Sequence, residues 1–103
     1  MKRTSEKAFE TAIELDPDFA NALANLGAVK ILKQELTEAA DLFERALTIE
    51  PTNVAAAGNL GLVYAQLGEY AKARDRLQQV LILSPGDERA RAALEEVRRL
   101  MRQ

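Results

Sequence analysis

The chain has 103 residues, 48% of them hydrophobic and 29% charged, which is enough for one compact core and too few for two ordinary domains. Aromatic residues make up only 5% and tryptophan is absent, so the core must consist of Leu, Val, Ile and Ala, which suits close-packed helices better than strands. The formal net charge is −2 and acidic and basic residues alternate, which argues against a nucleic-acid ligand. Neither cysteine nor histidine occurs, which excludes disulfides, thiol nucleophiles, zinc sites and the commonest general base.

The three prolines of the chain, Pro17, Pro51 and Pro85, are evenly spaced. The interval is 34 residues from the first to the second and again 34 from the second to the third. Aligning the two periods pairs Asn25-Leu26-Gly27 with Asn59-Leu60-Gly61, and the agreement continues along the whole period. A shared period of this length predicts a structural repeat. The chain then divides into residues 1–19, 20–53, 54–87 and 88–103.

Residues 1–19 predict a helix over residues 3–15 that has no partner in its own unit. Its apolar residues match the second helix of a repeat, and Phe9 and Ala12 stand where that helix would face a first helix. Two interpretations remain open. The chain is part of a longer array, or a second copy covers the Phe9 face in a homodimer.

Each of the two complete periods, 20–53 and 54–87, predicts a pair of helices. Apolar or small residues recur at spacings of three, four and seven in both helices of a pair. The small residues on the facing sides remove bulk, so that the two helices can approach closely. The first helices carry Leu23, Leu26, Gly27 and Lys30, and Ala57, Leu60, Gly61 and Tyr64; the second helices carry Ala39, Phe43, Ala46 and Leu47, and Ala73, Leu77, Val80 and Leu81.

Turn and cap residues predict where these helices begin and end. Gly68 is placed to end a first helix in the left-handed conformation, and Gln34 takes the same place in the preceding unit. Each proline follows a second helix, where the chain must change direction. The N-caps predicted for the next helices are Asp18, Asn53 and Asp87.

Residues 88–103 predict a capping helix that ends the stack. They continue the register of a first helix, but charged Arg91, Glu95 and Arg98 take the positions that face the second helix in the other units. A charged stripe cannot bury itself against a partner helix, whereas the apolar stripe on the other side can pack on the preceding helix. That apolar stripe consists of Ala90, Leu94, Val97 and Met101.

This pattern resembles the tetratricopeptide repeat, a 34-residue helix-turn-helix with Leu-Gly in its first helix, Ala and a large apolar residue in its second, and a closing proline. Leu23 and Ala57 replace a tryptophan that is frequent in that family, and Lys30 replaces its usual tyrosine. The resemblance covers nearly the whole chain. It implies an all-α fold in which antiparallel helix-turn-helix repeats stack in a right-handed α-solenoid of six helices, as a single domain over residues 1–103.

The sequence offers little for catalysis. Ser5 and Ser84 lie at predicted helix edges without a plausible base, and carboxylates such as Asp41 and Asp75 recur at exposed positions without a convergent partner. Neither a glycine-rich phosphate loop nor a calcium-loop pattern occurs. We therefore expect a protein that is not an enzyme and binds no cofactor and no metal.

The N-terminal stretch reaches charged Glu6, Lys7 and Glu10 before any apolar run, which is unlike a signal peptide. No segment approaches the ~20 apolar residues needed to cross a bilayer. We therefore expect no membrane association and a cytoplasmic location.

The most informative surface is the second face of each first helix, because successive units place these faces side by side in a concave wall. Small and apolar residues are frequent there, although solvated faces normally carry Lys and Glu; alternatively, alanine there only favours helix formation. Asn25 and Asn59 could hydrogen-bond the backbone of an extended peptide, or could tie adjacent helices together. The predicted partner-binding residues are Asn21, Ala24, Asn25, Ala28, Ile31, Ala55, Gly58, Asn59, Leu62, Ala65, Arg89, Ala92, Glu96 and Arg99, with Ala93 beside them.

Some tetratricopeptide domains hold the C-terminal carboxylates of chaperone tails with a clamp of Lys, Asn and Arg side chains. Asn59 and Arg89 fall at clamp positions, but Ala24, Ala28 and Ala93 occupy those that need Lys, Asn and a second basic residue. A clamp for two carboxylates is therefore not expected. The arginines of the capping helix alternate with glutamates, which is typical of a solvated face.

These observations predict an adaptor that holds a peptide or a helix of another protein in the groove. Ile31, Leu62 and the alanines would supply apolar contacts, the two asparagines would set the register, and Arg89 or Arg99 would read an acidic group. The alternative is a structural or self-assembly segment of a longer array, with the groove empty or filled by another copy. In that case the Phe9 face would determine the assembly state.

Overall fold

The computed structural model describes residues 19–103, and within this range the chain forms five helices and no strand. The predicted helix over residues 3–15, the Phe9 face and the Asp18 cap lie outside the described residues. The five helices are α2 (Ala20–Leu32), α3 (Leu36–Ile49), α4 (Val54–Gln66), α5 (Tyr70–Leu83) and α6 (Glu88–Met101).

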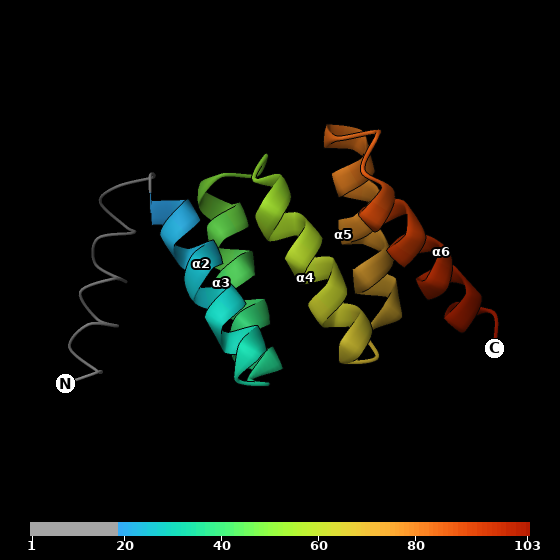
Figure 1. Cartoon of the computed structure of the whole chain (residues 1–103), viewed down its shortest axis with the longest axis horizontal. Helices are drawn as coiled ribbons and strands as arrows, with labels where there is room; N and C mark the ends of the chain where they lie inside the picture. The colour runs from blue at the N-terminus through green and yellow to red at the C-terminus, as the bar shows by residue number, and fades with distance from the viewer. Residues whose placement is uncertain (1–18) are drawn as a thin grey trace.

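The helices follow one another as an antiparallel stack from α2 to α6 (Figure 1). The hairpins α2–α3 and α4–α5 each pack internally, and contacts of α3 with α4 and of α5 with α6 join successive units. The first helices also touch along the stack, α2 with α4 and α4 with α6. The predicted all-α repeat architecture is confirmed, and the arrangement is consistent with a right-handed solenoid.

Each hairpin closes where a glycine of the first helix meets a large side chain of the second. A Cβ added to Gly27 would lie 2.8 Å from the ring of Phe43, and one added to Gly61 would lie 2.8 Å from Cγ of Leu77. Ala39 and Ala73 are fully buried. The prediction that tiny side chains let the paired helices approach closely is therefore confirmed.

The turns have the backbone geometry that the sequence predicts. Gln34 and Gly68 both adopt positive φ, 62° and 80°, immediately after the first helix of each hairpin. The Ala56 N–H donates to Asn53 Oδ1 at 3.0 Å, and the Ala90 N–H donates to Asp87 Oδ1 at 2.9 Å. Both carboxamide and carboxylate caps therefore form as expected.

Helix α6 packs inward along most of its length. Ala90, Leu94 and Val97 are buried, and the charged stripe on the other side is exposed. Met101 differs from the prediction, because it is 41% exposed. It is the last residue of α6, and its surroundings include long arginine side chains rather than a closed apolar surface.

A polar cluster ties the two complete units together. Glu44 of α3 accepts a hydrogen bond from the Tyr64 hydroxyl of α4 and pairs with Arg76 Nη2 of α5 at 2.6 Å. Burial and the bond to Glu44 raise the pKa of Tyr64 above its ordinary value, so the hydroxyl keeps its proton. Three helices are thereby linked across the boundary between the units.

Asn53, the N-cap of α4, also lies at the boundary between the units, and replacing it should lower the stability of the fold. It is 7% exposed and, besides its cap, Nδ2 donates to Asn21 Oδ1 and to Glu50 Oε1, both at 2.9 Å. We expect Asn53→Ala to lower the free energy of unfolding by about 2 kcal/mol, because a cap and two further bonds are lost. Urea denaturation followed by circular dichroism measures this loss.

Asp87→Ala is the matched control, since Asp87 makes the same cap without the additional side-chain bonds. It should cost about 1 kcal/mol. Equal losses for the two variants would show that the contacts of Asn53 with Asn21 and Glu50 contribute nothing to stability.

Candidate functional site

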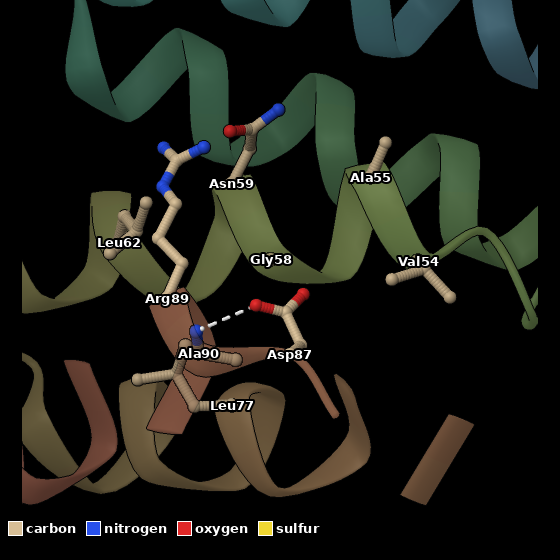
Figure 2. Close-up of a pocket in the computed structure, with 9 residues that line it drawn as sticks. All are labelled: Val54, Ala55, Gly58, Asn59, Leu62, Leu77, Asp87, Arg89 and Ala90. Carbon is tan, nitrogen blue, oxygen red and sulfur yellow. Dashed lines mark hydrogen bonds between the residues drawn. The ribbon is translucent and has the colours of Figure 1, made fainter. Parts of the chain in front are cut away.

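A pocket of about 180 Å³ lies between α4 and α6 (Figure 2). The α4 residues of the lining recur every three or four positions and so share one helical face, the N-cap and first turn of α6 form the other side, and α5 contributes one side chain. Small residues leave room in the middle, since a Cβ added to Gly58 would meet nothing closer than 3.9 Å. The lining residues are Val54, Ala55, Gly58, Asn59, Leu62, Leu77, Asp87, Arg89 and Ala90.

Two polar side chains of this pocket are unengaged. Arg89 extends from α6 toward the Asn59 and Leu62 side of α4 (Figure 2). Among residues 19–103, neither the Arg89 guanidinium nor the Asn59 amide forms a hydrogen bond or an ion pair. The third polar residue, Asp87, accepts the cap bond from the Ala90 N–H. The pocket therefore combines an apolar floor with an available cation and an available amide.

Five of the predicted partner-binding residues meet in this pocket, namely Ala55, Gly58, Asn59, Leu62 and Arg89. On α4, Ala65 is half-buried beyond the pocket. The α2 residues of the predicted surface lie one unit away: Asn25 is exposed, while Ala28 and Ile31 are half-buried.

Two α2 residues do not have the environment that the sequence predicts. Ala24 is only 7% exposed, because it belongs to the hydrophobic core, and it offers almost no surface to a partner. Asn21 is exposed, but its Oδ1 accepts the bond from Asn53. Asn21 thus binds the N-cap residue of α4, whereas the side chains of Asn25 and Asn59 form no hydrogen bond within the described part of the chain.

The remaining predicted residues lie further along α6. Ala92, Glu96 and Arg99 are exposed, outside the pocket, and Ala93 is half-buried. Arg99 Nη2 pairs with Glu96 Oε1 at 2.5 Å, and this partner lowers the pKa of the Glu96 carboxyl. Arg89 is therefore better placed than Arg99 to meet an acidic group of a partner.

Comparison with known proteins agrees with the geometry. Two models of the tetratricopeptide repeat match the sequence, over residues 30–97 and over residues 3–54. The chain belongs to the tetratricopeptide repeat family. A search of curated proteins finds no match.

Solved tetratricopeptide structures share this fold. The structure of MamA aligns with a TM-score of 0.78 and 27% identity over 88% of this chain and 53% of MamA, so the chain spans about half of that relative. The first such domain of Spaghetti (RPAP3), bound to the HSP90 peptide SRMEEVD, aligns with a TM-score of 0.82 and 16% identity over 99% of this chain and 86% of its own. The second tetratricopeptide domain of human RPAP3, in complex with the HSP70 peptide SGPTIEEVD, aligns with a TM-score of 0.78 and 23% identity. This alignment covers 89% of this chain and 77% of the RPAP3 domain.

The sequence pattern did not predict four residues that line this pocket, namely Val54, Leu77, Asp87 and Ala90. Asp87 and Ala90 were assigned only to the cap and to the inward stripe of α6, and Leu77 only to the core. Val54 could have been found, because it precedes Gly58 by one helical turn on the same face.

Other kinds of site find no support in the described residues. Within residues 19–103, acidic side chains do not gather into a group that could hold a metal ion. In the same range the helices are too short or too polar to cross a membrane.

Proposed function

We propose that this chain is a protein-interaction module that holds an extended peptide of a partner in the groove formed by α2, α4 and α6. Membership of the tetratricopeptide family supports an interaction module in general, because these repeats are generally non-catalytic. Peptide complexes of the RPAP3 domains support a peptide as the bound form. The observation that carries the proposal is the pocket in which Asn59 and Arg89 remain without a partner among the described residues.

The pocket suits an apolar side chain flanked by an acidic group. Val54, Leu62 and Leu77 supply an apolar lining for a side chain of moderate size. The Asn59 amide can donate to a peptide carbonyl and accept from a peptide N–H, which fixes the register of an extended backbone. The Arg89 guanidinium then pairs with a carboxylate beside the anchored side chain.

The α2 face continues this groove by one unit. Asn25 stands one period before Asn59 and is exposed, and Ile31 provides a partly exposed apolar side chain near the end of α2. A peptide that lies along both first helices would meet one amide on each. The two asparagines would then hold successive stretches of its backbone.

Charge placed in the groove should abolish capture. We expect the double variant Ile31→Glu, Leu62→Glu to lower the affinity for peptides selected by the parent chain from a random displayed library by at least about tenfold, since apolar anchors dominate such interfaces. Isothermal titration with the selected peptides measures the affinity, and circular dichroism confirms unchanged helicity.

The matched control places the same two charges elsewhere. Leu32 and Ile82 are 84% and 79% exposed and do not line the pocket, so Leu32→Glu, Ile82→Glu should leave the affinity unchanged. If the groove variant binds as tightly as the control, the groove is not the binding site.

A further inference from the structure

A second hollow, separate from the groove pocket, lies between α5 and α6. It has a volume of about 440 Å³ and is lined by Arg74, Gln78, Arg98, Met101 and Arg102. Three of the five side chains are guanidinium groups, and the lining contains no carboxylate. The sequence hides this cluster, because the arginines of α6 alternate with glutamates along the chain and Arg74 is more than twenty residues away.

Two of the three guanidinium groups of this hollow form no ion pair within residues 19–103, although Glu95 and Glu96 share an adjoining hollow with them. The Arg98 and Arg102 side chains form no hydrogen bond or ion pair with any residue from 19 to 103. Arg74 pairs only with its exposed neighbour Asp75, at 3.2 Å. Residues 70–103 hold eight Lys and Arg against five Asp and Glu, although the whole chain is acidic.

The repeat shows what would fill this place. One period earlier, the equivalent positions lie on α3 and α4, at the junction that receives α5. There Arg76 of α5 pairs with Glu44, and Gln79 Nε2 of α5 donates to the Pro51 carbonyl. The earlier equivalents of the hollow residues are Ala40, Glu44, Tyr64, Leu67 and Gly68. The hollow is thus the place where a helix following α6 would pack.

We propose that this hollow docks an acidic amphipathic helix of a partner protein, which packs against α5 and α6. At the inner junction the acidic residue belongs to the stack and the basic one to the incoming helix. At the hollow between α5 and α6 the stack side is basic, so electrostatic complementarity requires carboxylates on the incoming helix. Met101, 41% exposed among the arginines, offers the apolar contact.

The first unit shows how a cation on this face is paired. Arg98 takes the position of Lys30, and Lys30 pairs with Glu38 of the second helix α3 at 3.1 Å. A carboxylate on the docked helix would pair with Arg98 in the same way. Because the pairs are close to solvent, binding should weaken as salt screens them. This surface is distinct from the groove, and it stands or falls independently of the proposed function.

A designed helical peptide tests the proposal with the intact chain. The probe is a blocked amphipathic peptide with leucines on one face and flanking glutamates, compared with the same peptide carrying lysines in place of the glutamates. Fluorescence anisotropy at low salt should detect the acidic peptide and not the basic one. Arg98→Glu, Arg102→Glu should weaken binding by about tenfold or more, because attraction becomes repulsion at two sites.

The matched control is Lys33→Glu, Lys72→Glu, which makes the same change of charge outside both the hollow and the groove pocket. It should keep the affinity for the acidic helix within about threefold of the parent, since interface charges act mainly at short range. Equal loss in both variants would overturn the proposal in favour of a general charge effect. Binding of anionic lipid vesicles through Arg98 and Arg102, without binding of the acidic peptide, would also overturn the proposal. The same holds if Arg98→Glu, Arg102→Glu changes only self-association, measured by light scattering, and not the affinity for the acidic peptide.

Discussion

Replacing Phe43 by alanine is expected to lower the free energy of unfolding by about 3–5 kcal/mol, the usual cost of deleting a buried aromatic ring. Phe43 is fully buried, and its ring fills the space that Gly27 leaves on α2. The first hairpin would then lose the contact that joins its two helices. Since small domains are stable by only about 5–15 kcal/mol, much of the helical signal should disappear at low urea concentration.

Phe43→Leu is the control for this prediction. Leu77 occupies the equivalent position of the second hairpin and packs against Gly61 in the same way, so leucine suits this place in the repeat. The loss should stay below about 1.5 kcal/mol, because most of the volume is kept. Urea denaturation of both variants measures the difference. Alanine and leucine variants of equal stability would show that the Phe43 ring does not contribute to the packing between α2 and α3.

The sequence was sufficient for the parts of the fold that depend on the repeat. Gly27 and Gly61 predicted the close approach of paired helices, because glycine inside a helix costs stability unless a neighbouring group uses the space it leaves. Gln34 and Gly68 were predicted to end their helices with positive φ, and the structure confirms this. These features are local or belong to one hairpin, so spacing alone determines them.

Exposure on the groove side could not be predicted as well. Ala24 and Asn25 were both predicted to face the groove, yet Ala24 is buried in the core and only Asn25 is exposed. Asn21 and Asn25 are one helical turn apart, but Asn21 alone accepts a bond from Asn53, the N-cap of α4. Helical periodicity gives the direction of a side chain and not the distance to the next unit.

The charged side chains show the same limit. Along the sequence, Arg89 and Arg99 were equivalent candidates, but the structure pairs Arg99 with Glu96 and leaves Arg89 without a partner among residues 19–103. Arg74 meets Arg98 and Arg102 only because α5 and α6 lie side by side. Long charged side chains pair with groups that lie close to them in space, so the sequence alone does not show which arginines are paired.

Replacing Gly61 by alanine is expected to destabilise the chain although alanine favours helix. The new Cβ would lie 2.8 Å from Cγ and 2.9 Å from Cδ2 of Leu77, which is itself 1% exposed and cannot move aside freely. Overpacking of about 1–3 kcal/mol exceeds the gain of up to about 1 kcal/mol in helix propensity. Urea denaturation should therefore show a net loss of stability.

Gly58→Ala measures the effect of helix propensity alone in the same helix. Its new Cβ would find its nearest neighbour, Val80, at an ordinary 3.9 Å, so this variant should be stabilised by up to about 1 kcal/mol. Loss of stability in Gly58→Ala as well would mean that α4 does not tolerate alanine for reasons unrelated to the seam.

A double-mutant cycle then assigns the loss in Gly61→Ala to its contact with Leu77. In a Leu77→Ala background the obstructing atoms are gone, and Gly61→Ala should become neutral or stabilising, with a coupling energy of about 1–3 kcal/mol. Additive effects of the two substitutions would contradict a direct contact. The hairpin α4–α5 also supplies Leu62 and Leu77 to the groove pocket. A change in the distance between α4 and α5 at Gly61 would therefore change the pocket as well.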